Sequence, residues 1–179
     1  GVDFWFSDRS RGMFENAANL AEGYYQENQR QVGANTYAMA TDLGKQLSLV
    51  PIDSPAFSNY YLQQVVVRSL NESAIIEIGR DGVARTATAI NPDDRAAETR
   101  LGSAMVGRLD AGEDVVVVRQ PTRIEAAARL PGTDRAYVYA SRDTNVPGFQ
   151  QSARASAVLA DYNSLFDRSQ QLQLQFNGA

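Results

Sequence analysis

Two tyrosines and two arginines have the types and spacing that best fit the binding of a small ligand. Tyr137 and Tyr139 lie two positions apart in a β-prone run, so their side chains should share one face of a strand. Arg119 and Arg123 lie on either side of Pro121, in a connection between two strands. An aromatic wall with guanidinium groups at its edge fits a small anion such as a carboxylate. The alternative is structural: the tyrosines cover the sheet beneath a helix, and the arginines extend to water.

Catalytic and metal chemistry has weaker support. The adjacent carboxylates Asp93/Asp94 and Glu113/Asp114 suit acid–base work, but both pairs fall at turns or helix starts, where acids stabilise the helix dipole. The chain has no histidine and no cysteine, which excludes the usual zinc and iron–sulfur sites, thiol nucleophiles and Ser-His-Asp triads within it. We therefore expect no catalytic residue, no metal and no cofactor. A b-type haem is disfavoured for want of a histidine ligand.

Composition indicates an ordinary globular domain. Of the 179 residues, 44% are apolar and 21% charged, which argues against disorder. The net charge of −4 argues against a general nucleic-acid or anionic-membrane binder. No apolar run is long enough to cross a bilayer. The absence of cysteine is compatible with a periplasmic or a cytosolic domain, and the Gly1 start suggests a piece of a longer protein.

A long helix is predicted from Asp8 to about Leu49. It contains no proline, and apolar or small residues recur three and four positions apart at Phe14, Ala18, Ala21, Tyr25, Val32 and Met39. Asn28 and Asn35 interrupt this stripe, and a second stripe lies beside it at Ala17, Leu20, Tyr24, Ala34 and Ala38. The helix would measure roughly 60 Å, more than one sheet covers. We expect the same helix of a second subunit to pack against the rest, with the asparagines fixing register.

A second long helix is predicted from Phe149 to the end. Its apolar stripe keeps a strict heptad spacing through Ala155, Val158, Tyr162, Leu165, Ser169, Leu172 and Phe176. The residues expected to form the dimer contacts and carry the signal between helices are Tyr25, Val32, Met39, Val158, Tyr162, Leu165 and Leu172.

Shorter elements fill the middle of the chain. A helix is predicted over residues 56–71, strands over 74–78 and 83–89 around an Asp-Gly turn, a helix from Asn91 to Asp110 broken near Gly102, and strands over 114–119, 123–130 and 135–142. We predict an α+β fold, in which a five-stranded antiparallel sheet is flanked by long N- and C-terminal helices. The predicted division is a dimerising helix over 1–50, a core over 51–147 and a C-terminal helix over 148–179. This element order resembles a PAS or single Cache domain.

Several segments, taken in order, resemble one protein family. Residues 5–11, 15–16 and 21–24 (WFSDRSR, EN and AEGY) are similar to the stretch after the first membrane helix of nitrogen-regulation sensor histidine kinases of the NtrY type. Residues 38–43 (AMATDL) resemble that family's A-M-A-x-D-L helix. The segments 79–82, 107–113, 160–165 and 168–169 also fit, and the last two resemble the helix that leads into the second membrane span.

This resemblance implies the periplasmic sensing domain of an inner-membrane histidine kinase. The implied whole protein is an ATP-dependent kinase that phosphorylates a response regulator through a part outside this chain. The sensing domain would form a homodimer, take a small anionic or amino-acid ligand, and bind no nucleic acid. The alternatives are the ectodomain of a chemoreceptor or cyclase, and a module that binds no small molecule but meets a partner protein or holds a dimer. A third alternative is that the protein is a free-standing enzyme.

Overall fold

The computed structural model describes residues 8–90 and 95–144. A compact unit spans Asn28–Thr144, and the part of the first helix before it belongs to a second unit. This unit therefore includes the second half of the first helix together with the sheet. The expected C-terminal helix, with Val158, Tyr162, Leu165 and Leu172, lies outside the described residues.

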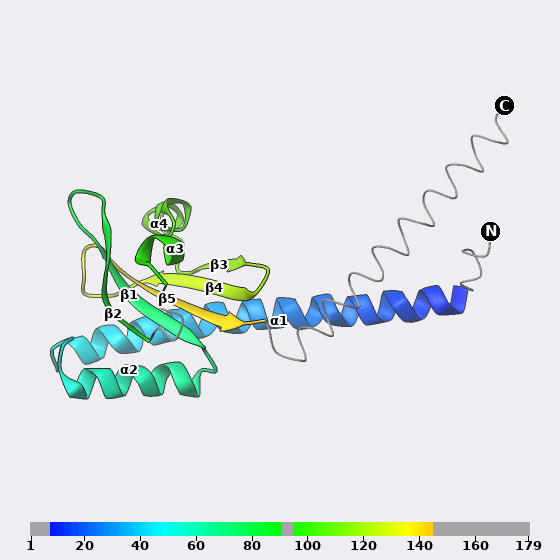
Figure 1. Cartoon of the computed structure of the whole chain (residues 1–179), viewed down its shortest axis with the longest axis horizontal. Coiled ribbons are helices and arrows are strands. Elements are labelled where there is room, and N and C mark those ends of the chain that lie inside the picture. Colours follow the sequence, from blue (N-terminus) through cyan, green and yellow to red (C-terminus); the bar gives the residue numbers. More distant parts are fainter. Residues whose placement is uncertain (1–7, 91–94, 145–179) are drawn as a thin grey trace, which may run out of the picture. The chain divides into compact units, whose positions relative to one another are not determined.

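Two helices precede the sheet. Helix α1 spans Asp8–Leu47 without interruption, as predicted, and α2 spans Pro55–Val67 (Figure 1). The predicted start of α2 is confirmed, because the Ser54 hydroxyl accepts a hydrogen bond from the Phe57 amide at 3.2 Å and Pro55 occupies the first turn. The helix ends before the expected Asn71 because Ser69 adopts a left-handed conformation, with φ of 55°.

The predicted five-stranded antiparallel sheet is confirmed. Its strands are β1 (Glu72–Ile78), β2 (Ala84–Ile90), β3 (Val116–Arg119), β4 (Arg123–Arg129) and β5 (Ala136–Asp143). Their order across the sheet is β2-β1-β5-β4-β3, and every neighbouring pair is antiparallel. The last strand is thus inserted between the first strand and β4, so β5 lies at the centre of the sheet.

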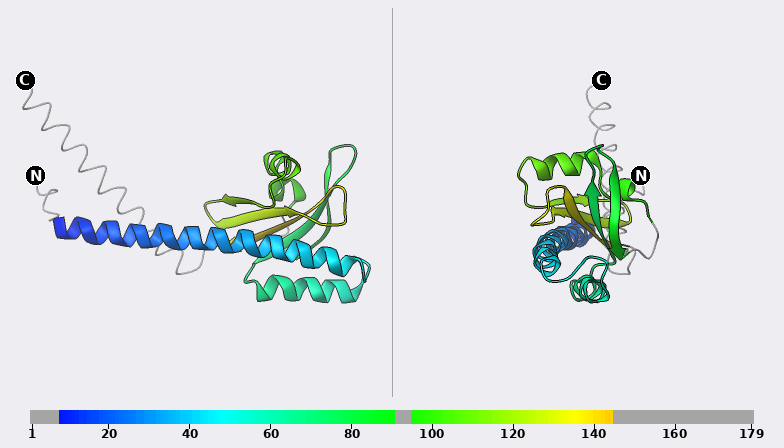
Figure 2. Two further views of the ribbon diagram at one scale, coloured as in Figure 1. Left: turned by 180° about the vertical axis from the view of Figure 1, so that it is seen from behind. Right: turned by 90° about the vertical axis from the view of Figure 1, so that its left-hand side faces the viewer.

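The connection from β2 to β3 carries two short helices. Helix α3 spans Ala97–Arg100, and α4 spans Ser103–Asp110. The break between them falls at Gly102, as expected, because this residue has an extended conformation with ψ of 159°. The chain can therefore turn between the two helices while both remain on the same side of the sheet (Figure 2).

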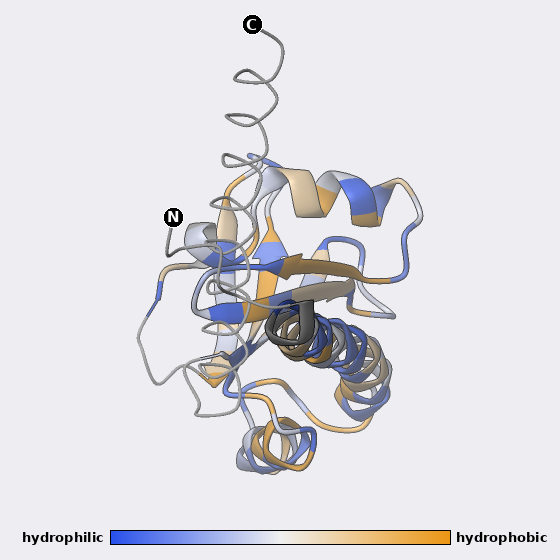
Figure 3. Ribbon diagram, turned by 90° about the vertical axis from the view of Figure 1, so that its right-hand side faces the viewer, coloured by the Kyte–Doolittle hydropathy of each residue, from blue (hydrophilic) through white to orange (hydrophobic). Residues whose placement is uncertain are grey.

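Helices cover both faces of the sheet. Helices α1 and α2 cover one face, and α3 and α4 cover the other, with hydrophobic strand residues between the two layers (Figure 3). Under α3 and α4 the buried core consists of Ala74, Ile76, Leu101, Met105, Leu109, Val116, Ala127, Tyr137 and Tyr139. Under α1 and α2 the largest buried side chains include Met39, Leu43, Phe57, Tyr61 and Ile75.

Two glycines let α1 approach the sheet closely. A Cβ atom at Gly44 would lie 2.9 Å from the Pro131 carbonyl oxygen, and one at Gly33 would lie 2.8 Å from a methyl group of Val117. Real Cβ atoms do not approach other atoms this closely, so only glycine permits this spacing without a shift. The position of α1 against β3 and the β4–β5 turn thus depends on these two residues.

Candidate functional site

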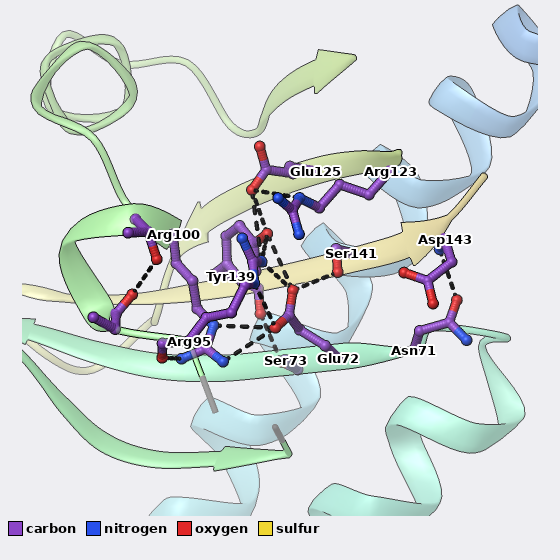
Figure 4. Close-up of polar contacts among 12 residues, drawn as sticks. Asn71, Glu72, Ser73, Arg95, Arg100, Arg123, Glu125, Tyr139, Ser141 and Asp143 are labelled. Carbon is purple, nitrogen blue, oxygen red and sulfur yellow. Dashed lines mark hydrogen bonds and ion pairs between the residues drawn. The ribbon is translucent and has the colours of Figure 1, made fainter. Parts of the chain in front are cut away.

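A buried network of charged and polar side chains lies on the face of the sheet covered by α3 and α4 (Figure 4). We call it the Glu72 network, and its members are Glu72, Arg95, Arg100, Glu125, Tyr139 and Ser141. Glu72 is 3% exposed, Arg100 2% and Glu125 4%. Charged side chains are almost never buried to this extent unless they are paired, and here each has partners of opposite charge.

Strand register brings the sheet members of the network together. Glu72 on β1 lies opposite Ser141 on β5, and Ser141 lies opposite Glu125 on β4. Tyr139 is two residues before Ser141, so its side chain points to the same face. The arginines come from the other layer: Arg95 precedes α3 and Arg100 is its last residue.

Glu72 is the centre of the network. Its carboxylate accepts hydrogen bonds from Arg100 Nε and Nη2 at 3.3 and 3.1 Å, from Ser141 Oγ at 2.7 Å and from the Arg95 guanidinium. Burial by itself would raise the pKa of this carboxyl, but the donors from Arg95, Ser141 and Arg100 outweigh it and lower the pKa to about 2. Glu72 is therefore ionised at neutral pH and fastens α3 to β1.

Tyr139 joins Glu72 to the second carboxylate. Its hydroxyl accepts a hydrogen bond from Arg95 Nη2 at 2.6 Å and donates its proton to Glu125. Burial, followed by the neighbouring Glu125 carboxylate, raises the pKa of Tyr139. The phenol is thus neutral, and it holds Glu125 in a fixed position inside the domain.

Arg123 lies at the edge of this network. Its Nε is 3.9 Å from the Glu125 carboxylate, and within the described residues this buried nitrogen has no hydrogen-bond partner. The Arg123 side chain as a whole is 28% exposed. An arginine with an unpartnered N–H donor has the chemistry to pair with a small anion.

The four predicted ligand-binding residues fall in three places. Arg123 and Tyr139 meet at the Glu72 network. Tyr137 is on the same face, but its hydroxyl donates to Asp110 on α4 at 2.6 Å. Arg119 pairs in register with Ile124, so it points to the opposite face, toward α1, and is exposed there. Of the four residues, the structure therefore brings only Arg123 and Tyr139 together.

Sequence reasoning missed most of the network. Glu125 shares its face of β4 with Arg123 and Arg129, a pattern typical of a solvent-facing side, yet both faces of β4 are covered and Glu125 is buried. Arg95 and Arg100 lie 23 and 28 residues from Glu72, and no local pattern links them. The available signal was Glu72 itself, a charged residue shortly before the apolar run over residues 74–76 of the same strand.

A second polar cluster lies on the opposite face of the sheet and joins β5 to α1. Arg142 donates to the side-chain oxygens of Asn28 and Gln31 at 2.9 and 3.1 Å. It also donates to the backbone carbonyls of Ser69 and Arg68, at 2.9 and 3.0 Å. One side chain on β5 therefore contacts α1 and the end of α2 together.

The polar interruptions in the α1 stripe have partners within the chain. Asn28 accepts from Arg142, and Asn35 accepts from Arg68 at 3.3 Å. Val32 and Met39 are fully buried, so they offer no surface to a second subunit. Tyr25 is 6% exposed. The predicted dimer stripe is therefore covered at Val32 and Met39. In the first half of α1 the exposed large apolar residues lie on the neighbouring stripe, with Leu20 76% and Tyr24 43% exposed, and Met13, two turns before Leu20, 67% exposed.

In residues 8–90 and 95–144, no three acidic side chains lie close enough together to coordinate a metal ion. The same residues form no helix with the length and hydropathy of a membrane span.

Comparison with known sequences places the chain among sensor-kinase relatives. The family model described as "NtrY N-terminal region" matches residues 1–179. The chain is 26% identical over 182 residues to the nitrogen regulation protein NtrY of Azorhizobium caulinodans, covering 98% of this chain and 22% of that protein. It is 20% identical over 176 residues to a putative NtrY-like sensor histidine kinase of Rickettsia felis, covering 98% of this chain and 29% of that protein. The chain thus spans about a quarter of the length of these relatives.

Solved structures give more distant likenesses. The periplasmic domain of Vibrio cholerae LuxQ aligns with a TM-score of 0.46 and 12% identity, over 79% of this chain and 69% of that one. The ligand-binding domain of the Pseudomonas aeruginosa amino-acid chemoreceptor PctC, solved with GABA, aligns with a TM-score of 0.42 and 14% identity, over 78% and 65%. These scores are low, and the family assignment comes from the sequence match over the whole chain.

Proposed function

Because the chain belongs to the family of NtrY N-terminal regions, we propose that it is the extracytoplasmic signal-sensing region of a membrane-bound sensor histidine kinase. The observation that carries this proposal is the family match over residues 1–179. The kinase reaction belongs to another part of the full-length protein, since the chain has no histidine to accept a phosphoryl group. A response regulator is the proposed partner of that other part.

The proposed ligand is a small anion or an amino acid, bound where Arg123 borders the Glu72 network. The unpartnered Nε donor of Arg123 would pair with a carboxylate. Glu125, which accepts from the Tyr139 hydroxyl and lies 3.9 Å from Arg95 and Arg123, could accept from an ammonium group. A thermal-shift series with acetate, succinate and single amino acids checks this, with Arg123→Gln as the variant. A ligand that stabilises both proteins equally would exclude Arg123 from the site.

The proposed path of the signal runs through β5. Tyr139 and Ser141 face the Glu72 network, whereas Arg142, the next residue, contacts α1 on the opposite side. A shift of β5 on ligand binding would therefore move α1 through Arg142. A coupling of roughly 1–3 kcal/mol is sufficient to bias an attached kinase between two states.

The proposed assembly is a homodimer in which α1 packs against its copy. Met13, Leu20 and Tyr24 are exposed and follow a helical spacing, with the small residue Ala17 between them. Such a stripe of apolar residues at intervals of three and four is the pattern of a helix–helix seam.

The relay is tested by changing the phase of α1 in the full-length kinase. Two alanines inserted after Gly23 rotate the preceding part of the helix by about 200°, whereas seven return it to within about 20° of its original direction. We expect the two-residue insertion to change ATP-dependent autophosphorylation in membranes and the seven-residue insertion to preserve it. Normal activity and response with the two-residue insertion would contradict the relay.

The extracytoplasmic location is tested separately. Arg80, at the exposed tip of the β1–β2 hairpin, can be replaced by cysteine in a chain that has none. We expect a membrane-impermeant maleimide to label Arg80→Cys in intact cells, with the unsubstituted protein as the control. Labelling only after the cells are lysed would place this region in the cytoplasm.

A further inference from the structure

A hollow of about 600 Å³ lies between the β1–β2 hairpin and α4. Ile78, Val83 and Ala84 line it from the hairpin side, and Leu101 and Val106 line it from the helical side. Ligand sites in proteins have volumes of roughly 300–1,000 Å³ and apolar walls with a few polar groups, and this hollow fits that description. None of its lining residues belongs to the Glu72 network.

Glycines keep the hollow open. Gly82, Gly102 and Gly107 all belong to the lining, and a Cβ atom at any of them would meet no other atom within 4 Å. The space beside each is therefore empty rather than filled by a neighbouring side chain. Gly82 has a φ of 78° and is needed for the hairpin turn, but Gly107 lies inside α4, where an alanine would favour the helix more.

One ionised group faces this apolar space. Among the lining residues that the structure describes, only Asp110 carries a charge, and Ser103 adds a hydroxyl. The Tyr137 hydroxyl donates to one carboxylate oxygen of Asp110 at 2.6 Å and so orients the group, leaving the other oxygen for a further donor. Asp110 is also the last residue of α4, where the helix dipole disfavours a negative charge, so a cation bound there would relieve that repulsion.

We propose that this hollow is a second binding site, for a small molecule with an aliphatic or aromatic body and a protonated amine. The body fills the space between the hairpin and α4, and the ammonium group pairs with Asp110. This site does not depend on the proposed sensing of an anion at Arg123. By contacting the hairpin and α4 together, such a ligand would fix the distance between them.

The test is an NMR titration of the ¹⁵N-labelled 179-residue chain with hexylamine, with hexanoate and hexanol as matched probes of the same chain length. Glycine amide signals are well separated, so Gly82, Gly102 and Gly107 report on the hollow, and Gly12 and Gly23 on α1 serve as internal controls. We expect saturable shifts at the three lining glycines with hexylamine, and at least tenfold weaker binding of hexanoate.

Three variants at two positions test the assignment without disturbing the core. Asp110→Asn should weaken hexylamine binding at least tenfold. Gly107→Leu should abolish binding by filling the hollow, whereas Gly107→Ala should retain it. Unchanged spectra of residues outside the hollow establish that each variant is folded. The proposal is overturned by the absence of saturable shifts, by equal binding of hexanoate, or by an Asp110→Asn protein that binds as tightly as the parent.

Discussion

Replacing Glu72 by glutamine removes the negative charge on which the buried network depends. The variant keeps the volume and shape of the side chain, but Arg100, whose side chain is 1% exposed, and Arg95 lose their shared counter-ion. The glutamine side-chain oxygen can still accept a hydrogen bond from one guanidinium. The amide NH2 of the glutamine, however, would face the N–H donors of the other guanidinium and could not pair with them. Removing one partner of a buried ion pair costs about 3–5 kcal/mol because the remaining charge is left uncompensated.

That cost is large relative to the stability of a domain of this size. Folded domains are stable by about 5–15 kcal/mol, so the variant should lose about a fifth or more of its free energy of unfolding. The corresponding fall in melting temperature is on the order of 10–20 °C. Urea unfolding followed by circular dichroism measures the free-energy change, and a thermal scan provides an independent check.

A matched control separates the buried network from ordinary surface pairing. Glu113 accepts from Arg108 Nε at 2.6 Å, but both side chains are about half exposed. Such exposed pairs contribute about 1 kcal/mol or less, so Glu113→Gln should be nearly neutral. If Glu72→Gln destabilises the domain no more than Glu113→Gln does, the argument that Glu72 fastens α3 to the sheet is wrong.

Other predictions concern acid, the Arg142 contacts and the packing of α1. The pKa of Glu72 is lowered from 4.5 to about 2. The carboxylate therefore stabilises the fold fully above pH 4.5, and this contribution is lost as the pH falls toward 2. Urea titrations should accordingly show that the stability difference between the parent and Glu72→Gln shrinks over that pH range. Arg142→Gln removes hydrogen bonds to two elements, and we expect a loss of about 2–3 kcal/mol together with faster amide hydrogen exchange in the second half of α1. Gly44→Ala places a Cβ against a backbone carbonyl and should cost about 1–3 kcal/mol of stability. Gly23→Ala has open space around it and should stabilise α1 by up to about 1 kcal/mol. The denaturation midpoints of the two variants should therefore move in opposite directions.

Local signals in the sequence predicted the elements well. The Ser54-Pro55 cap, the break at Gly102 and the Asp-Gly hairpin turn each depend on residues adjacent in the chain, and the structure confirms all three. The single antiparallel sheet followed because two strands, a helical connection and three further strands have few ways to pair. The family resemblance came from motifs whose order along the chain is itself a sequence property, and the match over residues 1–179 confirms it.

The composition of the site was decided by tertiary structure. Whether an arginine reaches a site depends on strand register, since adjacent positions point to opposite faces; this sends Arg119 toward α1 and Arg123 toward the network. A helical stripe shows that a face is apolar but not what covers it, and the sheet covers the face that carries Val32 and Met39. Glu72, Arg95 and Arg100 meet only after the connection folds back over the sheet. The sequence determined the elements and the family because both are encoded locally and in order, whereas the partners of buried charges are set by contacts between segments far apart in the chain.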